Sequence, residues 1–374
     1  MACFAEVASQ FAEAGGPYLY ARETFGRFAG IQVGWLAWLV RLTSAAANAN
    51  IFVVYVGEFW KPAVDRIPRL IILTLLLGVP TVINIRGVKS GANLSNMFAI
   101  AKLLPIAVFI GAGLIFLVPH GLPISTTPPA VPAAKWMEAI LLLVFVFGGF
   151  EGGLMAAGEV RDPRRSVPFA LMTALVITCV VYALVQIVTQ AALPAAASAP
   201  RPLADAARVF LGGWGAAFIS IGALVSIYGY LSSQMLNAPR LSFALAEGGD
   251  FPAFFAKVHP AFRTPWVSIL IYALLVWTLA AAADFRWNAM LSAVGRLFTY
   301  AAVCGALPAL RRWQPERPAF RLRLGLVFAA FGLAFCGVMI SRMGKSEMEV
   351  IAVIMLLALI NWWWAVRRVD RRVQ

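Results

Sequence analysis

Long runs of apolar residues, separated by short polar loops, are the dominant pattern of this sequence. A helix needs about 20 apolar residues to cross the hydrocarbon core of a bilayer, and ten segments are long enough to do so. They cover residues 30–57, 68–86, 93–118, 135–158, 167–191, 212–246, 265–283, 288–310, 321–341 and 348–366. The pattern therefore predicts an all-α, polytopic membrane protein with a single transmembrane domain over residues 1–374.

The composition supports this prediction, because 61% of the residues are hydrophobic and only 13% are charged. Soluble domains are about half apolar and about a quarter charged. The four cysteines, Cys3, Cys179, Cys304 and Cys336, fall in apolar segments and lack the spacing of metal ligands. We therefore predict neither a disulfide framework nor a metal site.

The positive charge of the chain is distributed unevenly between alternate loops. The formal net charge is +14, and nineteen lysine and arginine residues fall in loops on one side of the predicted spans against nine on the other. Because cytoplasmic loops carry an excess of lysine and arginine, we predict that the first side is cytoplasmic, together with the C-terminal tail and the connector at residues 12–29. Much of the charge then reflects membrane topology, and nucleic acid is not expected as a partner.

One stretch, residues 139–168, combines an apolar helix with a glycine-rich interruption. Four glycines surround Glu151 in the segment GGFEGG, which begins at Gly148. Glycine destabilises a helix interior by about 1 kcal/mol relative to alanine, and irregular backbone at membrane depth is tolerated only where it is buried in protein or lines a cavity. The stretch predicts a helix broken between Gly148 and Gly153, as in the binding sites of many secondary transporters. A continuous glycine-rich helix packed tightly on a neighbour is the alternative.

Three stretches resemble the amino acid–polyamine–organocation (APC) superfamily of permeases. They are residues 3–26, residues 145–168 with the loop GEVRDPRRSVP, and residues 238–265. The resemblance implies a five-plus-five inverted repeat with two further helices at the C-terminus, working by alternating access. The ten spans then correspond to helices three to twelve, with helices three to ten in residues 30–310 and the last two helices and the cytoplasmic tail in residues 311–374.

The family's first helix and the first half of its second have no counterpart in this resemblance. Residues 1–11 are too short to span a membrane and contain Glu6, so residues 1–29 are expected to form a half-helix and a cytoplasmic loop. We expect the half-helix to pack poorly, because its partner in the family is missing. The family's first helix would also supply amides for a substrate carboxylate, so a non-transporting remnant is an alternative to a working permease.

The predicted substrate site is centred on the break. Backbone carbonyls at Phe147, Gly148, Gly149 and Phe150 could accept hydrogen bonds from a substrate ammonium, with the two aromatic rings forming a gate or a cation–π wall. The alternative is that these rings only pack. Glu151 could stabilise the unwound segment by accepting backbone N–H groups or could bind a cationic substrate directly, and we favour the structural role.

Further polar residues lie inside other spans. Asn48 is a candidate substrate ligand, and Tyr228 belongs to a polar patch in 212–246 that also contains Ser232 and Ser233. The resemblance places Lys102 on the fifth helix, where sodium-independent members often carry a lysine in place of an ion. We therefore predict that Lys102 takes part in coupling and that its ammonium points towards Ser232 and Ser233, whereas a lysine that only reaches the membrane surface is the alternative.

The resulting functional hypothesis is a permease of the cell membrane that moves amino acids with protons or by exchange. A polyamine or organic-cation carrier is the alternative within transport, although the spans after residue 30 offer almost no acidic residue besides Glu151. No catalytic residues are predicted, because His120 and His259 both lie in loops and no nucleophile motif is present. The expected partners are an amino acid substrate and the lipid bilayer, without a cofactor.

Overall fold

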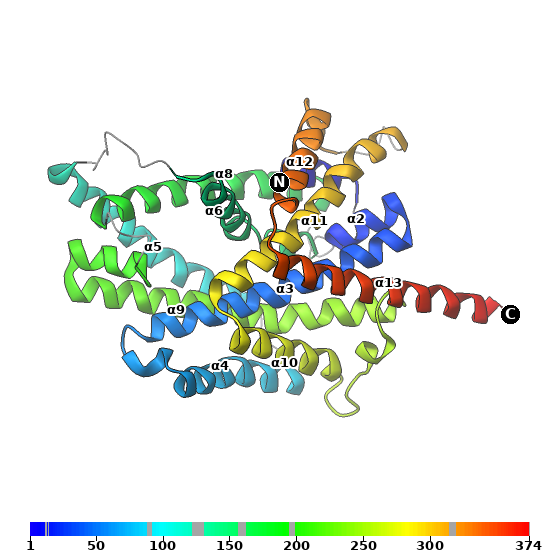
Figure 1. The fold of residues 1–374 in the computed structure, drawn as a ribbon, viewed down its shortest axis with the longest axis horizontal. Coiled ribbons are helices and arrows are strands. Elements are labelled where there is room, and N and C mark those ends of the chain that lie inside the picture. The colour runs from blue at the N-terminus through cyan, green and yellow to red at the C-terminus, as the bar shows by residue number, and fades with distance from the viewer. Residues whose placement is uncertain are drawn as a thin grey trace.

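The computed structural model describes residues 1–11, 13, 15–87, 92–121, 131–155, 162–193, 199–313 and 319–373. Of residues 92–102, 155 and 368–373 it describes the backbone alone. Within these ranges every regular element is a helix (Figure 1).

All ten predicted spans are helical. They are α3 (Arg27–Val56), α4 (Arg66–Arg86), α5 (Ala92–His120), α6 and α7 (Ala133–Val146 and Glu151–Met155), α8 (Pro163–Ala192), α9 (Pro202–Glu247), α10 (Trp266–Ala282), α11 (Phe285–Trp313), α12 (Gly325–Ile340) and α13 (Lys345–Val373). Eight of these spans are long and apolar enough to cross a membrane, and α10 and α12 are shorter apolar helices. The prediction of an all-α polytopic membrane protein is therefore confirmed.

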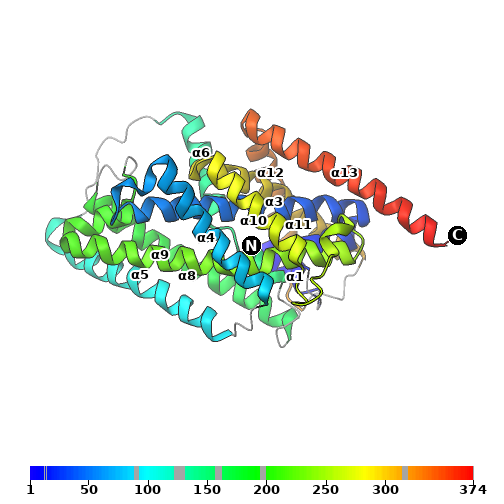
Figure 2. The ribbon, with the colours of Figure 1, turned by 90° about the horizontal axis from the view of Figure 1, so that it is seen from below.

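Helices α3 and α11 form the centre of the bundle. Of the 18 most apolar consecutive residues in each helix, 61% in α3 and 67% in α11 are buried, against 11% in α8. The two central helices approach closely at Gly295, where an added Cβ would lie 2.8 Å from Val40. Helices α5, α8 and α9 pack together at one edge, and α13 runs along another edge and extends beyond the bundle (Figures 1 and 2). The central pair therefore contacts most of the other spans.

Loops that were predicted on the same side of the membrane contact one another. These contacts include Thr264 with Ile85, Arg27 with Asp250 and Arg311 with Glu6 on the arginine-rich side, and Arg201 with Glu58 and Arg286 with Glu138 on the other side. The alternation of loops derived from the sequence thus agrees with the arrangement of the helices.

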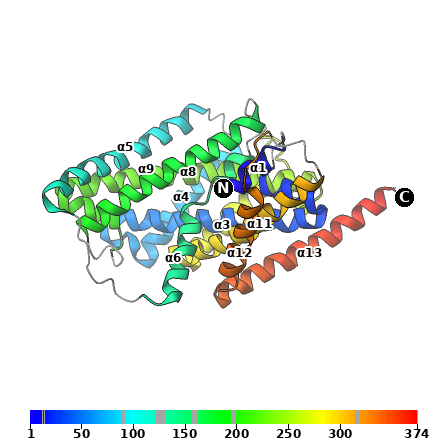
Figure 3. The same cartoon turned by 90° about the horizontal axis from the view of Figure 1, so that it is seen from above.

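The first segment, α1 (Ala2–Ala8), is packed tightly, so the prediction that it packs poorly is wrong. Glu6 is fully buried and forms a two-pronged ion pair with Arg311, at 2.6 Å from Nε and 2.8 Å from Nη2. The Phe4 ring lies 5.0 Å from the ring of Phe150 and 5.3 Å from that of Tyr300. Figure 3 shows α1 beside α11. These partners lie far away in sequence, and therefore the local pattern did not reveal them.

The predicted connector at residues 12–29 contains a helix, α2 (Gly16–Phe25), with Pro17 in its first turn. Proline is favoured in the first turn of a helix because its missing N–H has no intrahelical partner there. Among the described residues, two 3₁₀ turns, η1 (Lys61–Val64) and η4 (Ala253–Ala256), lie in loops. Because it contains α2, the connector at residues 12–29 is more ordered than its polar composition suggested.

Candidate functional site

The fourth predicted span, residues 135–158, is interrupted at residues 147–150. Helix α6 ends at Val146, and α7 begins at Glu151. Gly149 has a φ of 105°, a conformation that glycine tolerates and that other residues rarely adopt. The interruption is narrower than the predicted one, because Gly152 and Gly153 already lie in α7.

Glu151 is the residue that holds the interruption together. Its Oε2 accepts a hydrogen bond from the amide of Gly149 at 2.6 Å. Its Oε1 accepts from Arg296 Nε at 3.1 Å and from the hydroxyl of Tyr300 at 2.8 Å. One carboxylate therefore links the non-helical backbone to α11, as expected for a structural role.

Arg296 is buried and uses its remaining donors on three elements. Nη1 donates to Ser292 Oγ at 3.2 Å and to the carbonyl of Phe145 at 3.4 Å, and Nη2 donates to Ser44 Oγ at 3.1 Å. Ser44 and Ser292 are themselves 2.7 Å apart. The guanidinium thus ties α3, α6 and α11 to one another at the level of the break.

Gly148 is required by the position of Arg296. A Cβ added at Gly148 would overlap the guanidinium and the Cδ of Arg296. By contrast, a Cβ added at Gly149, Gly152 or Gly153 would meet no atom of the described residues within 4 Å. One face of the break is therefore closed by Arg296, and the opposite face borders open space.

The two aromatic residues of the break pack in different directions. The Phe147 ring lies 5.2 Å from the ring of Tyr182 on α8. The Phe150 ring contacts Phe4 and lies 5.6 Å from the ring of Tyr300. Both rings therefore pack against neighbouring helices, and their predicted role as a gate stays a prediction.

Asn48, the candidate on α3, contacts Ser44, which belongs to the cluster around Arg296. Asn48 Nδ2 donates to the carbonyl of Ser44 at 2.9 Å, one turn back on the helix. Arg41 lies one turn before Ser44, and its Nη1 donates to Gln234 on α9 at 3.2 Å. Asn50 lies two residues after Asn48, on a different face of α3, and its Nδ2 donates to the carbonyl of Ala283 at 2.9 Å.

Only part of the polar patch on α9 contacts the polar residues of α3. Gln234 reaches Arg41, and its Nε2 donates to the hydroxyl of Tyr230 at 2.9 Å. The side chain of Tyr228 is 37% exposed. Ser232 is half-buried, and the exposed Ser233 accepts from Asn237 Nδ2 at 3.2 Å.

Lys102 lies on α5, which packs against α9. Its side chain is outside the described part of the structure, and therefore its predicted direction is untested. The close packing of the two helices is carried by Gly222, where an added Cβ would lie 2.6 Å from Cβ of Pro105.

Sequence reasoning missed the partners of Glu151. Arg296 and Tyr300 are four residues apart in the sequence and share one helical face, but this spacing alone assigns no role to them. The available signal was charge, because a cation and an anion inside different spans are expected to pair at membrane depth.

A second charged cluster lies in the loops at the arginine-rich end. Asp250, after α9, is 1% exposed and accepts from Tyr18, from Arg22 Nη1 at 2.9 Å and from Arg27 Nε at 2.6 Å. Arg22 also donates to the Tyr18 hydroxyl at 2.6 Å, and Asn361 Nδ2 of α13 donates to the Asp250 carbonyl at 2.8 Å. Burial, together with the hydrogen bond to Asp250, raises the pKa of Tyr18 to about 12.

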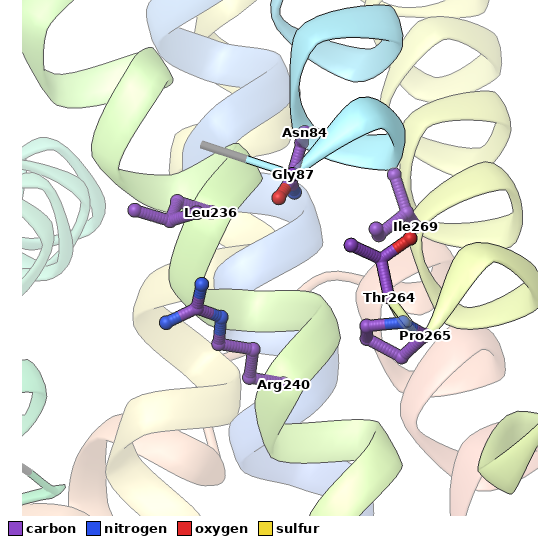
Figure 4. Close-up of a pocket in the computed structure, with 7 residues that line it drawn as sticks. All are labelled: Asn84, Gly87, Leu236, Arg240, Thr264, Pro265 and Ile269. Atoms are coloured by element: carbon purple, nitrogen blue, oxygen red, sulfur yellow. The ribbon is translucent and has the colours of Figure 1, made fainter. Parts of the chain in front are cut away.

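The cavity in Figure 4 lies away from the break. It has a volume of about 200 Å³ and lies between the end of α4, the C-terminal part of α9 and the start of α10. Its lining residues are Asn84, Gly87, Leu236, Arg240, Thr264, Pro265 and Ile269. None of the predicted site residues belongs to this lining, and Asn84 already donates to the carbonyl of Met235 at 2.6 Å.

The described residues contain no cluster of three or more histidine, cysteine or acidic side chains that could hold a metal ion. The four cysteines are free thiols, three of them buried.

Comparisons with known proteins give consistent matches along the chain. Residues 1–363 match a family described as amino acid permease. An uncharacterised transporter of Mycobacterium tuberculosis is 33% identical over 344 residues, which cover 89% of this chain and 75% of the relative. The serine/threonine exchanger of Bacillus subtilis is 30% identical over 278 residues, covering 71% and 61% of the two chains. The methylthioribose transporter of Bacillus subtilis is 26% identical over 358 residues, covering 89% and 75%.

Proposed function

The chain belongs to the amino acid permease family, and from this membership we propose that it carries neutral amino acids across the cell membrane by alternating access, coupled to protons or by exchange. The observation that carries the proposal is the interruption at residues 147–150, where the carboxylate of Glu151 already accepts hydrogen bonds from protein groups. Secondary transporters commonly bind their substrates at such discontinuous helices. The serine/threonine exchanger among the relatives is in keeping with a neutral substrate.

The break offers acceptors for a substrate ammonium. Among the described residues, no donor reaches the carbonyl groups of Phe147 and Gly148. An unpaired carbonyl at membrane depth is costly unless a ligand or water satisfies it. These two carbonyl groups are therefore the proposed ligands of the ammonium, next to the open face at Gly149.

The contacts of Glu151 argue against a cationic substrate. Both carboxylate oxygens are occupied, by the Gly149 amide on one side and by Arg296 and Tyr300 on the other. A polyamine or another organic cation would have to displace Arg296 from a buried pair to use this charge. Breaking such a pair costs several kcal/mol, so this alternative is disfavoured.

Membrane orientation and coupling are further parts of the proposal. The positive-inside rule places the arginine-rich loops and the C-terminus in the cytoplasm. Lys102 is proposed as the coupling residue because α5 packs against α9, where Ser232 and Ser233 lie.

An uptake assay with the purified protein in liposomes tests the proposed function. We expect saturable uptake of radiolabelled L-serine, L-threonine or L-leucine, stimulated by internal unlabelled substrate for an exchanger or by an imposed pH gradient for a proton-coupled carrier. Putrescine and L-arginine should neither be taken up nor compete. Saturable putrescine uptake would support the organic-cation carrier instead.

Methylthioribose belongs in the same panel, because one relative is named for its transport. Selective uptake of methylthioribose would replace the amino acid in the proposal while leaving the transporter function in place. Failure of every compound to bind or to be taken up, with protein that remains monodisperse, would favour a non-transporting protein.

A further inference from the structure

Arg41 is a charged residue in the middle of α3 whose side chain is accessible. Among residues 30–50 of this helix, only Arg41 and Asn48 are half-buried, and all the others are buried. Ser44 lies three residues after Arg41 and four before Asn48, so the three residues share one face of the helix. The Ser44 hydroxyl accepts from Arg296 Nη2 at 3.1 Å. The accessible face of α3 is therefore the one directed towards the break at Gly148.

The guanidinium of Arg41 lies inside the bundle. Its Nη1 donates to Gln234 Oε1 on α9 at 3.2 Å. The hydroxyl of Tyr272 on α10 donates to the carbonyl of Arg41 at 3.1 Å. Glu151 on α7 and Arg296 on α11 act on the same guanidinium electrostatically, with opposite signs. Because these helices surround Arg41, the space to which its side chain is exposed belongs to the interior of the bundle.

Glu151 is engaged by groups other than Arg41. Its Oε2 accepts from the amide of Gly149, and its Oε1 accepts from Arg296 and from the hydroxyl of Tyr300. A charged side chain at membrane depth is costly and faces a cavity or a partner of opposite sign. An anion that enters the space beside the break would meet the guanidinium of Arg41 already in place.

The chemistry of this guanidinium fits a carboxylate. Its five N–H donors form a planar fork, and two of them can donate in parallel to the two oxygens of a carboxylate. Gln234 holds one arm of the fork and is itself held by the hydroxyl of Tyr230, to which its Nε2 donates at 2.9 Å. Because Gln234 is neutral, it orients the guanidinium without neutralising its charge.

We propose that Arg41 binds the carboxylate of the substrate, while the carbonyl groups of Phe147 and Gly148 accept from its ammonium. This inference rests on the proposed function and assigns a group to the second charged end of the amino acid. The two ends of the site together select a zwitterion. An amine without a carboxylate keeps only the contacts of its ammonium, which agrees with the expected exclusion of putrescine.

Isothermal titration calorimetry of the purified full chain with amino acids and their α-amides tests the proposal. L-leucinamide and L-serinamide keep the shape of L-leucine and L-serine, but an uncharged amide replaces the carboxylate. At about pH 6.5 the α-amino groups of all four compounds are protonated. The unmodified protein should bind the preferred amino acid about 10- to 100-fold more tightly than its amide, because a hydrogen-bonded pair of charged groups is lost with the amide.

Substitutions of Arg41 should change this preference. Arg41→Gln removes the charge but keeps a polar side chain, so it should bind the amino acid and its amide with nearly equal affinity. Arg41→Lys keeps the charge without the fork, and its preference should be intermediate. Arg69→Gln is the matched control, because Arg69 is also half-buried and also contacts α3, through Asn50 Oδ1 at 2.8 Å. The control should keep the full preference.

Chemical modification tests the same assignment without a substitution, and it remains informative if a variant misfolds. Phenylglyoxal reacts with accessible guanidiniums, and peptide mass spectrometry measures its reaction at Arg41 and at Arg69. The preferred amino acid, at about ten times its dissociation constant, should slow the reaction at Arg41 about ten-fold and leave that at Arg69 unchanged. Equal modification of Arg41 with and without the bound amino acid would place the carboxylate elsewhere.

The outcomes separate this inference from the proposed function. A preference for the amino acid over its amide that survives in Arg41→Gln would show that Arg41 only supports the packing of α3 on α9. That result would overturn the inference and leave amino acid transport in place. Absence of binding of every amino acid by the unmodified protein would overturn the proposed function, and the role of Arg41 with it.

Discussion

Glu151 and Asp250 are both buried carboxylates shared by several donors, but they stabilise different kinds of structure. Glu151 lies within a span, where its main partner Arg296 has a side chain only 5% exposed. Asp250 lies in a loop, and its partners Arg22 and Arg27 have side chains that are 38% and 28% exposed. The first cluster fixes a non-helical segment inside the bundle, and the second joins three segments at its surface.

The difference in setting determines how each cluster responds to the loss of one group. A charge left alone inside the bundle keeps its full desolvation cost, because neither water nor salt can replace its partner. A guanidinium released at the surface can be hydrated and is screened by salt. Substitutions at the break should therefore be more damaging than equivalent substitutions in the loops.

The largest effect is expected from separating Glu151 and Arg296. Glu151→Gln and Arg296→Met should each lower the free energy of unfolding by about 3–5 kcal/mol, because each leaves an uncompensated charge. The double variant should lose less than the sum of the two single losses, since both charges are then gone. Reversible unfolding in mixed micelles measures this coupling.

Tyr300→Phe is the control substitution for the Glu151–Arg296 ion pair. It removes one donor to Glu151 but leaves both charges paired, so its cost should be about 1–2 kcal/mol. A double variant of Glu151 and Arg296 with strictly additive losses would mean that the two residues act independently, contrary to the structure.

The spans could be predicted from the sequence because burial in a bilayer imposes one simple rule, a long apolar segment for each crossing. The same rule located the interruption, since glycines beside a carboxylate conflict with a continuous apolar helix. The partner of Glu151 could not be derived, because Arg296 follows 145 residues later. Only three-dimensional packing decides which of the buried cations approaches it.

The tight packing of α1 and the helical structure of α2 could not be predicted from the sequence, for a related reason. The short segment that contains Glu6 was expected to pack poorly, and nothing near it in sequence pointed to Arg311, which lies in another part of the chain. Likewise, the polar residues Tyr18, Arg22 and Arg27 gave the composition of a loop, and their common partner Asp250 follows more than 220 residues later. Local polarity does not distinguish a solvated group from one that is paired at long range.

A smaller effect is expected in the loop cluster. Asp250→Asn should lower the free energy of unfolding by about 1–3 kcal/mol, because the asparagine amide loses the charge but still fills the site. The loss should shrink between about 0.05 M and about 0.5 M salt, since the exposed guanidiniums are screened. Glu151→Gln measured in parallel should show no salt dependence. A loss for Asp250→Asn that is as large and as salt-independent as that of Glu151→Gln would remove the distinction between the two clusters.

The smallest effect, and the most specific to the loop cluster, concerns the phenol of Tyr18. Tyr18 lies on α2, outside the spans. Burial and the hydrogen bond to Asp250 raise its pKa to about 12, above the ordinary value of 10.0 for a tyrosine phenol. A folded-state pKa above the unfolded one means that the protonated phenol stabilises the fold. This contribution is complete below about pH 10 and is lost as the pH rises towards about 12.

Tyr18→Phe should therefore cost about 1 kcal/mol at neutral pH, the value of a single hydrogen bond. The difference in thermal stability between the unmodified protein and Tyr18→Phe should stay constant from about pH 7 to about pH 9.5 and then decrease. Tyr20, also on α2, is buried, and burial alone raises its pKa, but it is present in both proteins, so its titration cancels in the difference. A difference that persists unchanged at about pH 11.5 would show that Tyr18 does not donate to Asp250. The loop cluster would then depend on the two arginines alone.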